Sequence, residues 1–427
     1  MTLLGSIASR RLLAVAMGFA LAWIITAVGT VLPIGPAAAR NLEPILGCGT
    51  ASNIGNANMA PLYVDGFPCN SPPFLADQNN ILFTNIKICA PGSKTNCQVI
   101  DHVQVDTGSI GLRIASSAVV NGSLLPAMPH VPTSGGQILS SCAVFADGTL
   151  LYGPVQTADV YIAGKSAKNF PVQIYGQTPP VSGCGVGGVQ LPRDANGLLG
   201  VRFRTQGNDI YYTCNPDGSS CQPDVSPSLT TPNLVSKFQN DNNGITIALS
   251  AIPTSGASEP VLGLLIFGVG TQADNTPPQG TVPLLADPST GLINLQIDGN
   301  NAPQALIDSG TSILQVNGPS LQTMCSDGFF YCPPPNTISL TLSSTGANTP
   351  AYTVNYTIGN ADNLIQNGPN DVAFNDLAAA PGGGDSILGL SFFFGKTISF
   401  VFDKQQSPLG TGPINAIWAP ITQVVGP

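Results

Sequence analysis

Short stretches of alternating apolar and polar residues recur along the chain, and turn-forming residues separate them. Alternation with a period of two indicates strands that turn one face to a core and the other to solvent. Five such strands are expected at Ala158–Ile162, Thr246–Leu249, Ile338–Leu342, Tyr352–Tyr356 and Thr397–Phe402. Few segments show a helical period, and the candidates are Pro319–Met324, whose proline suits a first helical turn, and Asp371–Ala380. The pattern predicts a mainly β protein.

The first 39 residues differ from the rest of the chain. Arg10 and Arg11 precede an apolar run from Leu12 to Leu32, and Ala37-Ala38-Ala39 follows it. This order of basic, apolar and small residues is typical of a secretory signal peptide, so we expect residues 1–39 to direct secretion or transport to the periplasm. Because the apolar run is long enough to cross a bilayer, the alternative is an uncleaved anchor that leaves the protein membrane-bound and facing the exterior.

The composition narrows the possible functions. The chain has 427 residues, of which 48 are glycine and 38 are proline, and only 9% are charged. Coiled coils and long-helix bundles need more charged helix-forming residues than this. The net charge of −9 argues against a nucleic-acid partner, which requires clustered Lys and Arg. With only His102 and His130 in the chain, we expect no metal and no other cofactor.

The ten cysteines all follow the expected signal segment. An even number of cysteines in an exported chain predicts disulfides. Three pairs are close in sequence and would each close a short loop: Cys89 with Cys97, Cys214 with Cys221, and Cys325 with Cys332. The remaining four cysteines can be paired in three ways, which the sequence leaves open: Cys48, Cys69, Cys142 and Cys184.

A pattern of residues occurs twice. Val105–Ile114 and Ile307–Val316 align without a gap, and each contains an Asp, a hydroxyl residue, a Gly and a second hydroxyl residue. Each is followed, about eighty to ninety residues later, by two apolar residues and a glycine, at Leu198–Gly200 and Ile387–Gly389. The repeated order predicts two homologous lobes, residues 40–252 and 253–427.

The repeated Asp motifs suggest a specific chemistry. Two carboxyl groups that lie a few ångströms apart cannot both ionise readily, so they share one proton over a wide pH range. The charged member can take a proton from water while the protonated member donates to a substrate carbonyl oxygen. The candidate residues are the catalytic Asp106 and Asp308, Gly108 and Gly310 for close backbone approach, Thr107 and Ser309 for bonds between the two loops, and Ser109 and Thr311 as donors to the carboxylates.

With these motifs the sequence resembles the pepsin-like aspartic peptidases. The resemblance extends to the C-terminal stretch from Ser386 to Asp403, which is similar to the ending of that family. It implies an all-β, two-lobed acid-protease architecture with a ψ-loop in each lobe, a monomer, and a peptide or protein as substrate. The stretch Cys97–Val103 and the following V-D-T-G-S-x-G-L-R-I are also similar to a bacterial exported family of unknown function.

Two positions depart from the pepsin-like pattern. The family usually has Trp seven residues after the first Asp, where this chain has Arg113; we expect it to anchor a substrate carboxylate or to form a structural salt bridge. The usual partner of that Trp is a Tyr on a hairpin called the flap, and the matching segment offers Phe145 or Tyr152. We expect His102 to be a structural or surface histidine. The sequence thus predicts an exported aspartic endopeptidase; the alternative is a catalytically idle cell-envelope protein that binds peptide or glycan in the cleft.

Overall fold

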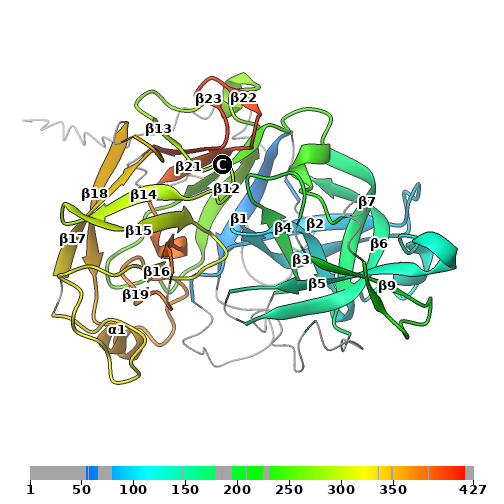
Figure 1. Ribbon diagram of the computed structural model, residues 1–427, viewed down its shortest axis with the longest axis horizontal. Coiled ribbons are helices and arrows are strands. Elements are labelled where there is room, and N and C mark those ends of the chain that lie inside the picture. The colour runs from blue at the N-terminus through cyan, green and yellow to red at the C-terminus, as the bar shows by residue number, and fades with distance from the viewer. Residues whose placement is uncertain are drawn as a thin grey trace, which may run out of the picture. The chain divides into compact units, whose positions relative to one another are not determined.

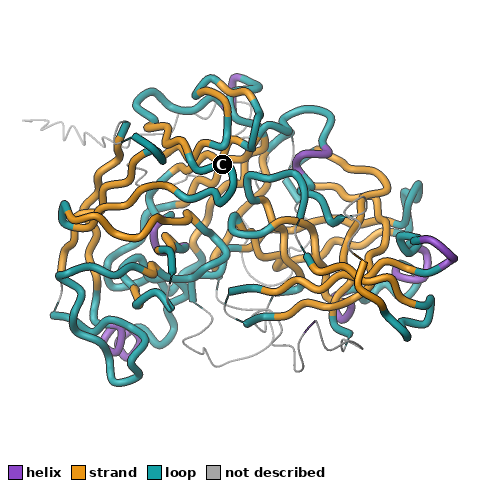
Figure 2. Tube along the Cα trace, in the orientation of Figure 1, coloured by secondary structure: helices purple, strands orange, loops and turns teal. Residues whose placement is uncertain are grey.

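Strands predominate in the computed structural model of the protein (Figure 2). The structure describes residues 54–55, 57–65, 79–146, 148–177, 184, 195–207, 209–224, 230–334, 336–347, 350–382 and 384–418. The expected signal segment 1–39 and the cysteines Cys48 and Cys69 lie outside these residues. Among the described helices, none combines the length and the apolar character that a bilayer crossing needs.

The described strands form one large sheet and two smaller ones (Figure 1). The large sheet has the order β10 (Gln222–Asp224), β9 (Ile210–Cys214), β5 (Ile138–Val144), β6 (Leu150–Ile162), β7 (Lys165–Tyr175), β4 (Ile110–Ala115), β8 (Gly197–Val201), β3 (Cys97–Asp106), β2 (Phe83–Cys89), β1 (Met59–Val64), β12 (Val261–Phe267), β11 (Gly244–Leu249), β21 (Thr397–Val401), β24 (Ile414–Trp418) and β13 (Val282–Leu285). The second has the order β18 (Ala351–Ile358), β17 (Asn336–Ser343), β14 (Ile293–Ile297), β15 (Asn300–Ile307), β20 (Ser386–Leu388), β16 (Leu314–Gln315) and β19 (Ala378–Ala379). The third pairs β22 (Gln406–Ser407) with β23 (Gly410–Thr411).

Helices are few and short in the described part of the chain. The α-helix is α1 (Ala361–Asn367), and the 3₁₀ turns are Ser116–Ala118, Leu125–Ala127, Ser134–Gly136, Val235–Lys237, Ala273–Asn275 and Leu390–Phe392. The side chain of Asn360 caps α1 by accepting a hydrogen bond from Asn363 N at 3.0 Å.

The same strand topology occurs once in each half of the chain. Strand β3 runs parallel to β8, β8 pairs antiparallel with β4, and β4 runs parallel to β7. In the second half β15 runs parallel to β20, β20 pairs antiparallel with β16, and β16 runs parallel to β19. Each set is a ψ-loop, in which one strand separates two neighbours that follow one another in sequence. This is the two-lobed, all-β, pepsin-like architecture that the sequence predicts.

Each ψ-loop needs glycine in its central strand because the backbone of a neighbouring segment passes very close. A Cβ at Gly200 would lie 2.6 Å from Ile110 N, and one at Gly389 would lie 2.1 Å from Ile313 O. Either distance is a severe clash. The glycine that ends each apolar-apolar-Gly motif is therefore required by packing.

The sheet that joins the two halves contains strands from both. Strands β11 and β12 lie on either side of the expected boundary at 252–253 and pair with each other. Strand β1 from the first half pairs with β12, and strand β21 from the second half pairs with β11. Side chains from both halves fill one hydrophobic core, with Leu62, Ile247 and Phe402 among its fully buried members. The division into lobes at residue 252 stays a prediction.

The strand expectations hold better than the helix expectations. Four of the five expected strands lie inside observed strands, and the last ends one residue earlier than expected, at Val401. The expected helix at Pro319–Met324 is wrong: Leu321 N closes a turn on Gly318 O, and Met324 forms a bridge with Tyr331 beside the Cys325–Cys332 disulfide. The second expected helix is also wrong, because its last residues pair with β16 as strand β19.

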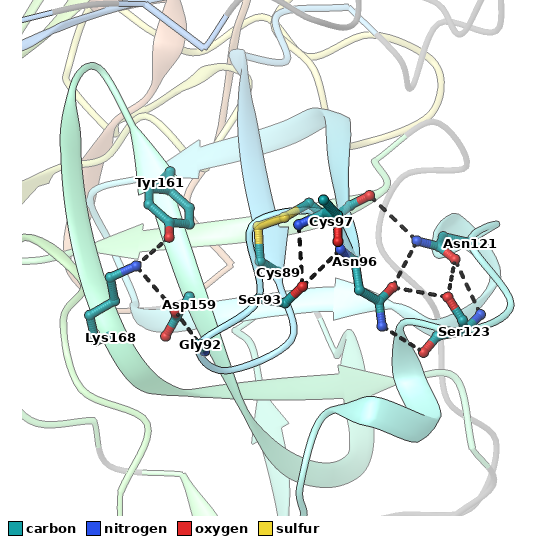
Figure 3. Close-up of a disulfide and its surroundings, with 11 residues drawn as sticks. Cys89, Gly92, Ser93, Asn96, Cys97, Asn121, Ser123, Asp159, Tyr161 and Lys168 are labelled. Atoms are coloured by element: carbon teal, nitrogen blue, oxygen red, sulfur yellow. Dashed lines mark hydrogen bonds and ion pairs between the residues drawn. A yellow bond between two sulfur atoms is a disulfide. The ribbon is translucent and has the colours of Figure 1, made fainter.

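The three short cysteine pairs that the sequence indicates are bonded in the structure, and Cys142 pairs with Cys184. Figure 3 shows the Cys89–Cys97 bond, which closes the loop between β2 and β3. Asp159 on β6 accepts hydrogen bonds from Gly92 N in this loop and from Lys168 Nζ, both at 3.1 Å. The loop is thus tied both by a covalent bond and by a buried carboxylate.

Candidate active site

The two ψ-loops place Asp106 and Asp308 beside each other. Asp106 is the last residue of β3, and Asp308 directly follows β15. In the first lobe, Asp106 lies opposite Gly200 in the parallel pairing of β3 with β8. In the second lobe, Asp308 N donates a hydrogen bond to Leu388 O of β20 at 3.0 Å. Both side chains are buried, with 4% and 8% of their surface exposed.

Reciprocal hydrogen bonds join the two Asp loops. Thr107 N donates to Ser309 Oγ at 3.2 Å, and Ser309 N donates to Thr107 Oγ1 at 2.9 Å. Each hydroxyl also donates across the interface to a strand carbonyl, Thr107 Oγ1 to Ile307 O and Ser309 Oγ to Val105 O. Because all four donors are used, the loops are held in one relative position.

Each carboxylate accepts a matching pair of hydrogen bonds from its own loop. Gly108 N donates to Asp106 Oδ1 at 2.7 Å, and Ser109 Oγ donates to Asp106 Oδ2. Gly310 N donates to Asp308 Oδ1 at 2.9 Å, and Thr311 Oγ1 donates to Asp308 Oδ2 at 2.8 Å. The repeated sequence therefore produces two equivalent hydrogen-bond environments.

The glycines of the two motifs contact the opposite carboxyl group. A Cβ at Gly108 would lie 2.7 Å from Asp308 Cγ, and one at Gly310 would lie 2.4 Å from Asp106 Oδ1. Any side chain at either position would displace a carboxyl group.

We therefore expect Gly108→Ala and Gly310→Ala to perturb the Asp pair and to leave the fold intact. Displacement of a carboxyl group by a few tenths of an ångström changes the spacing on which its proton sharing depends. The measurement is the titration of the two Asp carboxyl groups by ¹³C NMR. Gly122→Ala is the matched control, because no atom lies within 4 Å of a Cβ at Gly122 and its φ is not positive. Unchanged titration in both motif variants would contradict the observed contact.

The pair has unusual acidity. Burial, the charge of Asp106 and a hydrogen bond to Asp106 raise the pKa of Asp308 to about 8, while the bonds from Thr311 and Gly310 act in the opposite direction. Asp308 is therefore protonated at neutral pH beside a second carboxyl group. Such a pair can act as an acid and a base at once.

His102 lies on β3, four residues before Asp106; its side chain is buried and belongs to a partly exposed ionic cluster. Its ring nitrogens lie 3.2 Å from Asp101 Oδ2 and 3.2 Å from Asp65 Oδ2. Burial lowers the pKa of His102, but the hydrogen bonds and charges of the two aspartates outweigh it and raise the pKa to about 9. A raised pKa favours the charged form of His102 at neutral pH, and its contacts with the two aspartates favour a structural role.

We expect His102→Asn to lower the free energy of unfolding at pH 6 and to have less effect at pH 10. The pKa of His102 is about 9 in the folded protein against 6.5 for an unperturbed histidine, so its charge stabilises the fold fully below pH 6.5 and the contribution is lost as the pH rises through 9. His102 has φ +48°, a conformation that Asn tolerates well, so the backbone is not the cause of the change. Urea unfolding at both pH values tests this, and an equal loss at each would contradict it.

Arg113 is fully buried and forms a salt bridge with Asp209. Its Nη2 donates to Asp209 Oδ1 at 2.9 Å and to Ile110 O at 2.9 Å, and Nη1 donates to Gln173 Oε1 at 3.3 Å. Asp209 directly precedes β9, and β9 pairs with β5. The structure thus favours the structural reading of Arg113 over the substrate anchor, and links it to the β5–β6 hairpin.

That hairpin contains the two residues that the sequence offers as flap candidates. Tyr152 is buried on β6, with its hydroxyl oxygen 3.4 Å from Cys221 Sγ and its ring against Tyr212. Phe145 begins the turn between β5 and β6 and packs against a cluster that includes Leu198. Of the two flap candidates, only Phe145 lies at the turn, and its role stays a prediction.

Two residues near the pair were missed in the sequence. Gln104 Nε2 donates to Gly310 O at 3.1 Å, across the two loops. Arg202 directly follows β8, and burial lowers the pKa of its guanidinium group, while the nearby charges of Asp308 and Asp106 act in the opposite direction. A cation directly after the apolar-apolar-Gly-apolar stretch was the signal in the sequence, since charged residues are rare in this chain.

Comparison with known proteins agrees with the sequence expectation of an uncharacterised family. The model of a family described as "Protein of unknown function (DUF3443)" matches residues 55–417. The chain belongs to this family. No curated protein matches the sequence. Among solved structures, the chain is similar to an aspartic proteinase from Irpex lacteus, with 14% sequence identity, a TM-score of 0.47, and coverage of 86% of this chain and 98% of that chain. Membership of the DUF3443 family by itself assigns no activity, so function has to be argued from the site.

Proposed function

We propose that this protein is an exported aspartic endopeptidase, in which Asp106 and Asp308 activate a water molecule for attack on a peptide bond. The observation that carries the proposal is the geometry of two buried carboxyl groups in matching hydrogen-bond environments, each packed against the glycine of the opposite loop. The four disulfides of the described residues are consistent with an oxidising destination such as the periplasm or the exterior.

The chemistry follows from the different protonation of the two groups. Asp106, in its charged form, accepts a proton from water as the water oxygen attacks the carbonyl carbon. Asp308 donates its proton to the carbonyl oxygen, which forms a tetrahedral diol and prevents the build-up of a free oxyanion. A proton then passes from the pair to the amide nitrogen and the C–N bond breaks. One hydroxyl of the diol gives its proton back to the pair as the carboxylic acid forms, so the pair again holds one proton.

The hydrogen bonds of the loops support these roles. Donors from Gly108 N and Ser109 stabilise the charge on Asp106, and the bonds between Thr107 and Ser309 fix the spacing of the two carboxyl groups. A catalytic group needs such positioning because small displacements cost large factors in rate. This chain's own residues supply every proton transfer in the scheme.

The test is incubation of the purified protein with a peptide library at several pH values from 3 to 9, with cleavage sites identified by mass spectrometry. We expect endoproteolytic cleavage that pepstatin blocks and that chelators and serine-protease inhibitors leave unchanged. An Asp106→Asn preparation purified in the same way controls for contaminating proteases. If the wild type cleaves nothing and yet binds peptide or glycan, the second expected function, a catalytically idle binding protein, replaces the proposal.

A further inference from the structure

Arg202 is a positive charge beside the Asp pair that no carboxylate neutralises. It directly follows β8, and its backbone N donates to Ser109 O at 2.9 Å. Its Nη1 donates to Gly108 O at 3.3 Å, and its Nη2 donates to Thr290 O. The ion pairs of the described residues do not include Arg202. Both hydrogen bonds that its guanidinium group donates therefore go to main-chain carbonyl groups.

The position of this charge is well fixed. The guanidinium group bridges the first Asp loop and the loop that contains Thr290, which belongs to the second half of the chain. Its Nε is buried and has no hydrogen-bond partner among the described residues. The guanidinium carbon Cζ lies 5.4 Å from the centre of the Phe203 ring. A half-buried cation is screened by water far less than an exposed one. Its field therefore acts on the nearby carboxyl groups.

The charge is present on one side of the pair only. When the two apolar-apolar-Gly motifs are aligned, Arg202 corresponds to the uncharged Ser391 in the second lobe. The other charged groups near Arg202 are Arg204 on the same segment, Asp287 at the start of the Thr290 loop, and Asp403, whose N donates to Phe203 O. Asp287 is partly exposed and accepts hydrogen bonds from Ser289 and Thr290, and Asp403 has Lys404 Nζ at 3.7 Å, so water and neighbouring groups weaken their fields.

We propose that Arg202 is a positioning residue that holds a fixed positive charge beside the Asp106–Asp308 pair and thereby sets the pH range over which the pair keeps its shared proton. The cation stabilises the doubly charged form of the pair and so favours release of the shared proton. The pH at which the pair loses its shared proton is therefore lower with Arg202 present than it would be for two buried carboxyl groups without a nearby cation. The effect on activity rests on the proposed function, whereas the effect on protonation does not.

The test compares Arg202→Gln with Arg202→Lys, and uses two measurements. ¹³C NMR of Asp-labelled protein, with Asp308→Asn for assignment, gives the pH at which the pair loses its shared proton. We expect Arg202→Gln to raise it by about one pH unit and Arg202→Lys to restore most of the wild-type value. The control is Arg204→Gln, which removes an exposed cation two residues away and should change the titration little. The pH profile of kcat/KM, if hydrolysis is found, should shift in the same direction.

Two results would overturn the inference: an Arg202→Gln variant that titrates like the wild type, or equal shifts in Arg202→Gln and Arg204→Gln. Arg202→Met, a second neutral variant of similar volume, replaces Arg202→Gln if that protein does not fold. Because the NMR titration needs no substrate, a protein that hydrolyses no peptide would refute the proposed function and still decide the role of Arg202.

Discussion

Asp106→Asn and Asp308→Asn should each reduce peptide hydrolysis by at least about 10³-fold, and the double variant should be hardly less active than either single one. This result is expected because the two carboxyl groups share one proton and act on one water molecule, so the loss of either removes the whole function. Initial rates on one cleavable peptide, for the wild type and the three variants, measure it. Additive losses in the double variant, or activity that persists in Asp308→Asn, would mean that the two groups do not act together.

The same variants should fold, which keeps the loss of activity interpretable. The pKa of Asp308 is raised to about 8 in the folded protein, against 3.8 for an unperturbed aspartate. Between pH 4 and pH 8 this carboxyl group therefore ionises in the unfolded protein only, and the free energy of unfolding of the wild type falls as the pH rises. Asp308→Asn removes this penalty. We expect the Asn variant to be at least as stable as the wild type at pH 8 in urea unfolding. A strongly destabilised variant would show that the pair is held by interactions that Asn cannot replace.

Arg113→Met should lower the free energy of unfolding by about 3–5 kcal/mol, because it leaves Asp209 buried without its counterion. The exposed fractions of the two side chains are 2% and 7%, so water cannot replace the lost partner. Burial already raises the pKa of Asp209, and removal of Arg113 raises it further. Asp209 in the variant should then take up a proton at low pH, and the loss of stability should be smaller at pH 5 than at pH 8. Urea unfolding at the two pH values measures both effects.

Two further variants control this prediction. Lys404→Met removes the lysine of an exposed pair, 3.7 Å from Asp403, and should leave stability unchanged within error. The double variant Arg113→Met/Asp209→Leu removes both buried charges and should recover part of the loss. A loss in Arg113→Met no larger than that in Lys404→Met would contradict a structural role for the buried salt bridge.

The sequence predicted the paired aspartates because the signal for each is local, whereas the ψ-loops were implied by the resemblance to the pepsin-like peptidases. The Asp-hydroxyl-Gly-hydroxyl motif supplies the donors for its own carboxylate within three residues, as Ser109 and Thr311 show. The glycines that end the apolar motifs mark where another strand crosses closely. The short disulfides are also local, since each joins cysteines seven or eight residues apart.

The contacts that the sequence could not predict join residues far apart in the chain. Arg113 and Asp209 are separated by 96 residues, and Cys142 and Cys184 by 42. Nothing near either residue identifies its partner. The α1 helix could not be predicted for another reason: it is short and lacks a clear apolar period, and its sequence signal is limited to the capping residue Asn360 and the acidic Asp362 in the first turn.

The most direct test of the account is the pH dependence of kcat/KM for one cleavable peptide with the wild-type protein from pH 3 to 10. Because Asp308 must carry the shared proton to act as the acid, we expect activity to be lost as the pH rises, through a single step with an apparent pKa near 8. Activity that increases above pH 9, or that stays constant through pH 8, would contradict catalysis by the Asp106–Asp308 pair.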